Sequence, residues 1–216
     1  MNSKIFSNEK FCKAPVVGII RGMSEKATLL KVVETYISVG FYTLEITMNT
    51  DGVLDLIEAL RTEFPELNVG AGTVCTIEDY TNAVNCGAQF IVTPIVNEDV
   101  IKQAVSSKTP IFPGAFTPTE IYKAWSLGAD AVKVFPATQL GPGYIKDILA
   151  PLNNIKLIPT GGVTLENIKT FFQAGAIGVG MGGNLLNKRY ILNHDFERIK
   201  SDLIKIKNEI DEFIEL

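Results

Sequence analysis

The sequence predicts a parallel (β/α)8 barrel, formed by a single α/β domain over residues 1–216. Eight short apolar segments are each followed by a stretch with helical spacing, and these segments start roughly 20–27 residues apart. A chain of 216 residues also fits one barrel at the compact end of the size range. The alternative is a doubly wound open sheet. However, the first strand lacks the Gly-x-Gly-x-x-Gly turn that is typical of that fold.

The predicted strands are short runs rich in apolar residues. In a closed parallel barrel both faces of a strand are covered, so a strand can be apolar on both faces. In chain order, the strands are predicted over residues 16–20, 42–47, 68–72, 90–94, 111–114, 131–135, 155–159 and 177–180. Each of them leads into one of the predicted helices.

The predicted helices are bounded by capping and stop signals. Ser24 caps the first helix, and Gly40, Gly87, Gly128 and Gly175 each follow a helix as its stop residue. The helices are predicted over residues 24–39, 52–63, 76–85, 97–106, 117–127, 143–150, 164–174 and 195–214. The last helix carries one apolar stripe at three- and four-residue spacing, formed by Phe196, Ile199, Leu203, Ile206, Ile210 and Phe213.

One lysine, Lys133, lies in the middle of the predicted strand 131–135. Because side chains alternate along a strand, Lys133 and Phe135 share one face while Val132 and Val134 share the other. Inside a barrel, the loss of hydration lowers the pKa of an ammonium group and makes a neutral amine accessible. Such an amine attacks carbonyl groups to form a Schiff base. Lys133 is therefore a candidate nucleophile.

The strand over 42–47 follows the same logic. Thr43, Glu45 and Thr47 share one face, and Leu44 and Ile46 share the apolar face that suits packing against helices. The polar row is therefore expected to point into the barrel. Glu45 could form a structural ion pair with Lys133, but such buried pairs add little net stability. The functional interpretation makes Glu45 the proton shuttle beside the nucleophile.

Two glycine-rich segments follow the last two strands. Residues 160–163 contain Gly161 and Gly162, and residues 180–184 contain Gly182 and Gly183. Glycine lets backbone N–H groups surround a phosphate, and the loops after strands seven and eight are the usual phosphate position of this fold. Together the two segments predict a phosphorylated ligand. Arg21 and Thr73 follow the first and third predicted strands, so both could face the open end of the barrel that the loops after the strands surround. The planar guanidinium of Arg21 is suited to binding a carboxylate.

Composition excludes several other classes of function. The net charge of −4 provides no field for attracting nucleic acid, and no run approaches the roughly 18 apolar residues of a membrane span. The first ten residues lack a hydrophobic signal core, so a cytoplasmic location is expected. Cys12, Cys75 and Cys86 lack metal-ligand spacing and are interpreted as reduced thiols. A single histidine, His194, makes a histidine-ligated metal site unexpected and is interpreted as a surface or helix-start residue.

Six motifs in order carry a resemblance to a known family. They are Leu44-Glu-Ile-Thr-Met48, Gly70-Ala-Gly-Thr73, Val92-Thr-Pro94, Pro113-Gly114, Val132-Lys-Val-Phe-Pro136 and Pro159-Thr-Gly-Gly162. Together they resemble the 2-keto-3-deoxy-6-phosphogluconate (KDPG/KHG) aldolases over nearly the whole chain. The resemblance implies a class I aldolase of carbohydrate metabolism on a (β/α)8 barrel, commonly a homotrimer, with no metal and no other cofactor.

The resemblance also implies roles for individual residues. It makes Lys133 the Schiff-base lysine and Glu45 the general acid/base. It places Thr73, Pro94 and Phe135 around the pyruvyl part of the substrate. The phosphate then falls at Gly161, Gly162, Gly182 and Gly183. The expected reaction is cleavage of a 2-keto-3-deoxy-6-phospho sugar acid to pyruvate and glyceraldehyde 3-phosphate.

The sequence departs from the family pattern at two positions. Asn49 stands where many members have a substrate-binding arginine, which leaves Arg21 as the expected carboxylate partner. Asn184 stands where a serine is often found in the phosphate loop, and an amide can still donate. The neutral residue at position 49 and the loop at 140–145 also resemble the galactonate-type branch, which cleaves the C4 epimer.

Several alternatives remain open at this stage. The C4 configuration of the substrate and activity on 4-hydroxy-2-oxoglutarate are not determined by the sequence. A phosphate-binding barrel isomerase or decarboxylase could use Glu45 and Lys133 as an acid/base pair without a covalent adduct. A sugar-phosphate sensor on the same barrel is the other alternative.

Overall fold

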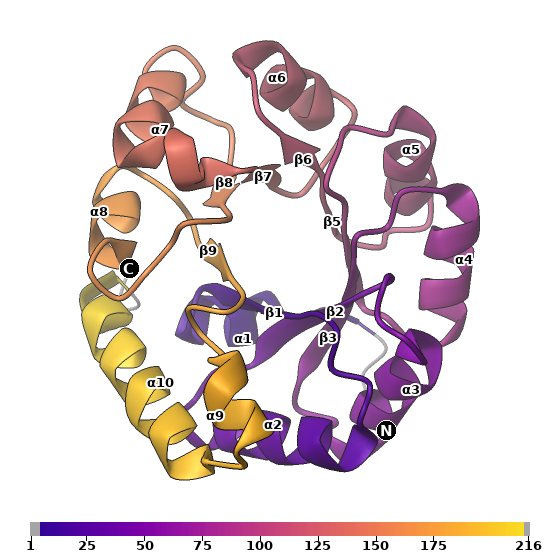
Figure 1. Cartoon of the computed structure of the whole chain (residues 1–216). Helices are drawn as coiled ribbons and strands as arrows, with labels where there is room; N and C mark the ends of the chain where they lie inside the picture. The colour runs from indigo at the N-terminus through magenta and orange to yellow at the C-terminus, as the bar shows by residue number, and fades with distance from the viewer. Residues whose placement is uncertain (1–4, 214–216) are drawn as a thin grey trace.

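The computed structural model describes residues 5–213 and has an α/β fold with parallel strands at the centre and helices in a ring around them (Figure 1). Within these residues there are nine strands: β1 (Val16–Ile20), β2 (Thr43–Thr47), β3 (Asn68–Gly72), β4 (Phe90–Val92), β5 (Ile111–Phe112), β6 (Gly114–Ala115), β7 (Val132–Val134), β8 (Leu157–Pro159) and β9 (Val179–Met181). All strand pairs in the two sheets are parallel.

The strands form two parallel sheets, so the predicted α/β fold with parallel strands is confirmed, while the closure into one eight-stranded barrel stays a prediction. One sheet has the order β5-β4-β3-β2-β1-β9 and the other has the order β6-β7-β8. The predicted strand over 111–114 is divided at Pro113 into β5, which pairs with β4, and β6, which pairs with β7. Proline has no N–H to donate to a ladder, which explains the interruption. Between β8 and β9, a single backbone bridge joins Thr160 to Gly180.

A helix follows each predicted strand, as the sequence indicated. The helices are α1 (Asn8–Lys13), α2 (Lys26–Ser38), α3 (Val53–Glu63), α4 (Ile77–Asn85), α5 (Glu98–Ser106), α6 (Pro118–Ser126), α7 (Gly141–Leu149), α8 (Ile168–Gln173), α9 (Lys188–Leu192) and α10 (Phe196–Ile210), with 3-10 turns η1 (Ala137–Gln139) and η2 (Asp211–Phe213). The apolar stripe on α10 is confirmed, because Ile199, Leu203, Ile206 and Ile210 are buried.

Several helix boundaries differ from the predictions. The N-cap of α2 is Glu25 rather than Ser24, because the Glu25 carboxylate accepts hydrogen bonds from the N–H groups of Ala27 and Thr28. The helix expected from residue 164 begins only at Ile168. The short helices α1 and α9 were not predicted, since neither is long enough to show a helical period. Residue 214, the predicted end of the last helix, and residues 1–4 of the N-terminal segment lie outside the described residues.

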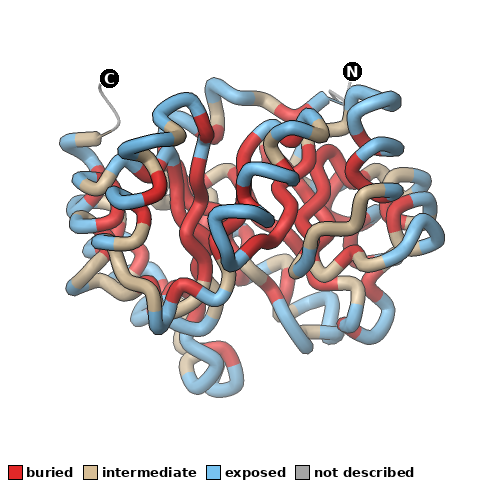
Figure 2. The backbone as a smooth tube through the Cα atoms, turned by 90° about the horizontal axis from the view of Figure 1, so that it is seen from above, coloured by how far each residue is buried: buried red, intermediate tan, exposed pale blue. Residues whose placement is uncertain are grey.

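Buried apolar residues form two groups, and every strand residue except Ile19 is buried, in the interior that Figure 2 shows in red. The larger group lies between the strands and the helices. The smaller group lies on the opposite face of the strands and contains Phe6, Phe11, Val17, Phe90, Val92, Phe112, Ala131 and Ile158. Successive side chains of a strand point to opposite faces, so the residues of one strand belong to different groups. In β4, Ile91 belongs to the larger group, and Phe90 and Val92 belong to the smaller one.

Helix α1 contributes Phe11 to this inner group. The Phe11 ring lies beside those of Phe6 and Phe112, with centroids 6.2 and 6.4 Å away. It also packs over the bare α-carbon of Gly178, where a Cβ atom would lie 2.6 Å from its Cζ. The helix therefore covers the amino-terminal ends of the strands. The described helices include none that is long and apolar enough to cross a membrane.

Candidate active site

Lys133 is the central residue of β7 and is only 5% exposed. Its neighbours Val132 and Val134 belong to the larger apolar group, so the lysine side chain points to the inner face of the strands. The lysine backbone N–H donates to the carbonyl of Pro113 (2.9 Å), which ties β7 to the interrupted strand beside it. The alternation of side chains along β7 therefore gives Lys133 the inward orientation that was predicted from the sequence.

Glu45 is the central residue of β2 and is 1% exposed. Leu44 and Ile46 pack in the larger apolar group, so Glu45 also points to the inner face. Its carboxylate occupies space beside Gly72 that a Cβ atom would fill. Its Oε2 atom is buried and has no hydrogen-bond partner. A buried acceptor without a partner is costly, and such an atom indicates a site organised for a reacting group.

Lys133 and Glu45 line the same small internal cavity of about 10 Å³, with room for roughly one water molecule. In the described part of the chain no ion pair within 4 Å joins the two groups. Burial lowers the pKa of Lys133; the Glu45 charge opposes this effect and the Arg21 charge adds to it. Burial raises the pKa of Glu45, and the positive charges of Lys133 and Arg21 oppose that rise. Desolvation therefore drives both groups toward their neutral forms.

The ring of Phe135 also lies beside the lysine. The Nζ atom of Lys133 is 4.8 Å from the ring centroid, within range of a cation–π contact. Residues two apart on a strand share a face, so this contact follows from the sequence spacing. Phe135 is partly exposed and faces the larger cavity above the lysine.

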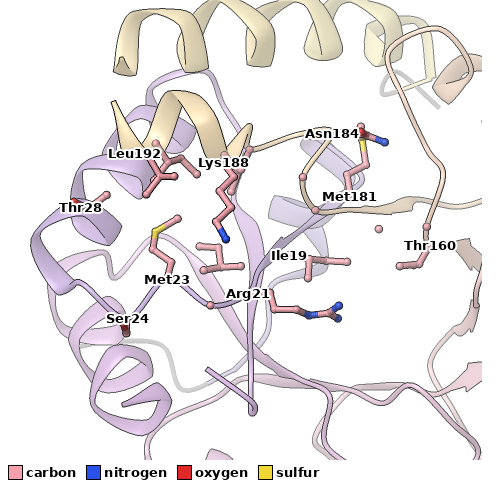
Figure 3. A pocket seen from close by; sticks show the side chains of 18 of the residues that line it. Ile19, Arg21, Met23, Ser24, Thr28, Thr160, Met181, Asn184, Lys188 and Leu192 are labelled. Atoms are coloured by element: carbon pink, nitrogen blue, oxygen red, sulfur yellow. The ribbon is translucent and has the colours of Figure 1, made fainter. Parts of the chain in front are cut away.

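This larger cavity has a volume of about 970 Å³ and lies at the carboxyl ends of β1, β7, β8 and β9 (Figure 3). Eight of the residues proposed from the sequence line it: Arg21, Lys133, Phe135, Gly161, Gly162, Gly182, Gly183 and Asn184. Lys133 lines both cavities, so its amine lies between the open mouth and the enclosed carboxylate of Glu45. A carbonyl substrate entering from the mouth would meet the amine first.

A family model for "KDPG and KHG aldolase" matches residues 7–201. This chain belongs to the KDPG and KHG aldolase family. The family consists of aldolases, which are carbon–carbon lyases, and its match spans every strand and every predicted site residue.

Individual relatives agree with this assignment. The chain is 36% identical over 175 residues to the 2-dehydro-3-deoxy-6-phosphogalactonate aldolase of Escherichia coli K12, covering 80% of this chain and 85% of that protein. A native KDPGal structure has a TM-score of 0.87 at 31% identity, covering 98% of this chain and all of that one. The KDPG aldolase of Legionella pneumophila, solved with pyruvate as a covalent carbinolamine intermediate, has a TM-score of 0.85 at 26% identity, covering 93% and 98%.

Besides Glu45, which lines only the small cavity, three of the residues proposed from the sequence do not line the larger cavity. Asn49 is exposed in the turn after β2. Thr73 follows β3 directly and has a positive φ of 57°, a conformation uncommon for a threonine. Pro94 follows β4, where its carbonyl lies against the bare α-carbon of Gly114, 2.5 Å from where a Cβ atom would be. The pyruvyl-binding roles of Thr73 and Pro94 stay predictions.

The two glycine segments meet at the cavity as the family resemblance implied. Gly161 and Gly162 have φ values of 90° and 75°, which L-residues rarely adopt. The side chain of Asn184 donates to the carbonyl of Val163 (2.9 Å) and so links the segment after β9 to the segment after β8. Helix α8 begins only at Ile168, several residues after the glycine pair. The backbone donors of this segment that line the cavity are therefore the glycine N–H groups and not those at the start of a helix. Asn184 therefore has a linking contact that sequence reasoning did not predict.

Three of the polar residues that line the larger cavity, Thr160, Lys188 and His194, were not assigned to the site by sequence reasoning. Thr160 is buried and lines both cavities, and its alternation with Ile158 could have revealed its inward orientation. Lys188 and His194 line the rim of the larger cavity from α9 and the turn after it. No signal could have placed these two, because α9 was not predicted. His194 is exposed and immediately precedes the N-cap of α10, as expected for a helix-start residue.

Metal-ligating side chains do not gather in residues 5–213, where no group of three or more histidine, cysteine, aspartate or glutamate side chains could hold an ion. The three cysteines are unpaired.

Proposed function

We propose that this chain is a class I aldolase that cleaves 2-dehydro-3-deoxy-6-phosphogluconate to pyruvate and glyceraldehyde 3-phosphate. The observation that carries the proposal is the placement of Lys133, whose amine is desolvated, faces an open cavity and lies above the buried carboxylate of Glu45. A lysine whose pKa is lowered by burial supplies the neutral amine that Schiff-base chemistry needs.

The first half of the reaction forms the imine. The neutral amine of Lys133 attacks the C2 ketone, and a proton moves from nitrogen to oxygen to give a carbinolamine. Loss of water then leaves a protonated imine between Nζ and C2. This cation accepts the electron pair of the C3–C4 bond, so the proposed mechanism contains no step for a metal.

The second half of the reaction breaks the C3–C4 bond and then protonates C3. The carboxylate of Glu45, directly or through one water molecule, removes the proton of the C4 hydroxyl. The C3–C4 bond then breaks to give glyceraldehyde 3-phosphate and an enamine of pyruvate. Glu45, now protonated, returns its proton to C3, and water hydrolyses the imine to pyruvate and the free amine. A carboxyl whose pKa burial has raised is suited to holding that proton between the two steps.

The remaining site residues bind the substrate in this proposal. Arg21 pairs with the substrate carboxylate, and Phe135, Thr73 and Pro94 surround the pyruvyl carbons. The phosphate is held by the N–H groups of Gly161, Gly162, Gly182 and Gly183, with Asn184 linking their two segments. The support for these roles is that Arg21, Phe135 and the glycines line one cavity with Lys133.

The test is covalent trapping. Incubation with pyruvate and sodium borohydride should add one reduced pyruvyl group, found on the peptide that contains Lys133. Lys133→Arg should abolish both adduct and turnover, because guanidinium does not deprotonate in proteins. Lys156→Arg is the matched control, since Lys156 is exposed just before β8. A folded protein that cleaves substrate without an adduct would favour the non-covalent isomerase or decarboxylase mechanism. Ligand-induced stabilisation with no product would favour a sensor.

A second candidate substrate is the C4 epimer, 2-dehydro-3-deoxy-6-phosphogalactonate. It is favoured by Asn49, which is neutral and exposed outside the cavity, and by the 36% identity to an aldolase named for that substrate. Coupled assays with both epimers and with 4-hydroxy-2-oxoglutarate would rank the three by kcat/KM. The epimer with the higher value is the substrate.

The proposal also includes the closure of the barrel, the single domain, the oligomeric state and the location of the protein. A closed eight-stranded barrel is supported by the Thr160–Gly180 bridge between β8 and β9 and by the continuity of β5 and β6 through Pro113. The single domain over residues 1–216, the homotrimer and the cytoplasmic location stay predictions. Sedimentation analysis would test the trimer directly.

A further inference from the structure

The phosphate end of the larger cavity is built from neutral groups. The glycine N–H groups carry no formal charge, and the amide of Asn184 already donates to Val163. The chain as a whole has a net charge of −4, so its overall field does not attract an anion. A phosphorylated substrate therefore needs a local cation in addition to these donors.

Lys188 is a cation that none of the other residues in the cavity neutralises. It is the first residue of α9, and its side chain points from that helix into the cavity, while Arg21 extends across the cavity toward Thr160 (Figure 3). Within residues 5–213 no hydrogen bond or ion pair engages its amine. By contrast Lys31, which also lines the cavity, is paired with Glu34 at 2.7 Å.

The cavity also lacks a free carboxylate that could pair with Lys188. Glu25 is the one acidic residue among those that line it, and both of its oxygens are used at the start of α2. Its Oε1 accepts from the N–H of Ala27 (3.1 Å) and its Oε2 from that of Thr28 (2.7 Å). The amine of Lys188 is therefore available to an anion that enters from solvent.

The backbone fixes Lys188 close to the glycine segment. The N–H groups of Leu185 and Leu186 both donate to the carbonyl of Gly182 at 2.9 Å, which turns the chain back toward β9. Asn187 then caps α9 through the N–H of Arg189, at 2.9 Å. Leu186 is buried, so this connection is anchored in the apolar core. Lys188 and Gly182 thus belong to one short, hydrogen-bonded unit.

We propose that Lys188 is a specificity-determining residue that binds the phosphate of the substrate together with the N–H groups of the glycine segments. The inference rests on the proposed aldolase function and adds to it a residue that selects phosphorylated over unphosphorylated keto acids. An ammonium acts as a compact point charge on a flexible stem, which suits a phosphate that has already been oriented by backbone N–H groups. Arg21 remains free for the carboxylate at the other end of the same molecule.

The test compares phosphorylated with unphosphorylated substrates. For Lys188→Gln, the ratio of kcat/KM for the phosphorylated keto acid to that for 4-hydroxy-2-oxoglutarate should fall about 10- to 100-fold, as expected for one charged hydrogen bond. Most of the change should appear in KM. Lys188→Arg should retain most of the ratio. Arg189→Gln is the matched control, because Arg189 is the adjacent exposed cation on α9 and does not line the cavity.

Two results would overturn the inference. An unchanged ratio in Lys188→Gln would show that the amine does not recognise phosphate. An equal loss on both substrates, with the ratio preserved, would indicate a structural role. Calorimetric titration with inorganic phosphate provides a readout that does not depend on catalysis: affinity should drop at least tenfold in Lys188→Gln and not in Arg189→Gln. If the wild-type chain forms no pyruvate adduct, the aldolase proposal fails while this titration still decides the role of Lys188.

Discussion

The carboxylate of Glu45 lies against the bare α-carbon of Gly72 on the neighbouring strand. A Cβ atom at Gly72 would lie 2.5 Å from Cδ of Glu45, closer than such atoms can approach. Gly72 ends β3, which pairs with β2 in parallel register. The absence of a side chain at this position therefore gives Glu45 the space in which its carboxylate faces the cavity that it shares with Lys133.

Gly72→Ala should displace that carboxylate and lower kcat by roughly 10²-fold, the scale expected when a reacting group moves by about 1 Å. Gly143→Ala is the matched control, because a Cβ atom there meets nothing within 4 Å. The loss of thermal stability caused by Gly72→Ala should largely disappear in a Glu45→Ala background, where no carboxylate is displaced. Full activity in Gly72→Ala would contradict this role.

The buried carboxyl of Glu45 should make stability depend on pH. Its pKa is raised by burial above the value of 4.5, so the native state binds more protons than the unfolded state between these two values. The stabilisation from the protonated form is present below pH 4.5 and is lost as pH rises through the folded-state pKa. Above that pKa, Glu45→Gln should be more stable than the wild type, by about 1.4 kcal/mol for every pH unit that separates the folded-state pKa from the unfolded-state pKa. Urea unfolding at several pH values measures this difference. If the free energies of unfolding of Glu45→Gln and the wild type differ by the same amount at every pH, this prediction is refuted.

The ring of Phe135 should favour the charged form of Lys133. Phe135→Leu removes a cation–π contact at 4.8 Å that favours the charged amine, so the pKa of Lys133 should fall further. Exchange of the pyruvate methyl protons with deuterium follows enamine formation and can be monitored by NMR as a function of pH. Its midpoint should shift to lower pH in Phe135→Leu and stay in place in Phe135→Tyr. A shift to higher pH would argue against this electrostatic role.

Helix α1 should contribute to stability through Phe11. This ring is 5% exposed and packs in the inner apolar group, so Phe11→Ala should lower the free energy of unfolding by about 3–5 kcal/mol. Cys12→Ala, at an exposed position on the same helix, should change it by less than about 0.5 kcal/mol. Denaturant unfolding provides both values. A loss below about 1 kcal/mol in Phe11→Ala would show that α1 is dispensable for the inner group.

The inward orientation of Lys133 and Glu45, the proposed catalytic pair, could be predicted because strand alternation is a local property. The apolar residues on either side of Lys133 and of Glu45 determine which face each side chain occupies, and the structure orients both inward as expected. The glycine pairs also reached the same cavity, since both directly follow strands whose carboxyl ends lie on one side of the molecule. Helix stops at glycine were predicted for the same local reason.

Other features could not be predicted because they depend on contacts between distant segments. Pro113 was visible in the sequence, but which strands its interruption separates depends on the pairing of β5 with β4 and of β6 with β7. The N-cap of α2 was missed for a local reason, because the side chain of Glu25 is longer than that of Ser24 and reaches two backbone N–H groups of the first turn. Asn49 stands at the position where many family members have a substrate-binding arginine, and only the structure shows that the turn after β2 leaves it exposed and outside the larger cavity.

By itself, the sequence determined the alternation of strands with the helices that follow them, the inward direction of Lys133 and Glu45, and the glycine segments at the strand ends. Only the tertiary structure decided how those groups act together. Burial on the inner face shifts the pKa values of both titratable groups, because desolvation depends on all the neighbours and not on the adjacent residues alone. The tertiary structure also brought Lys188 to the cavity, since α9 is too short to be recognised by period and is held in place by backbone hydrogen bonds to Gly182.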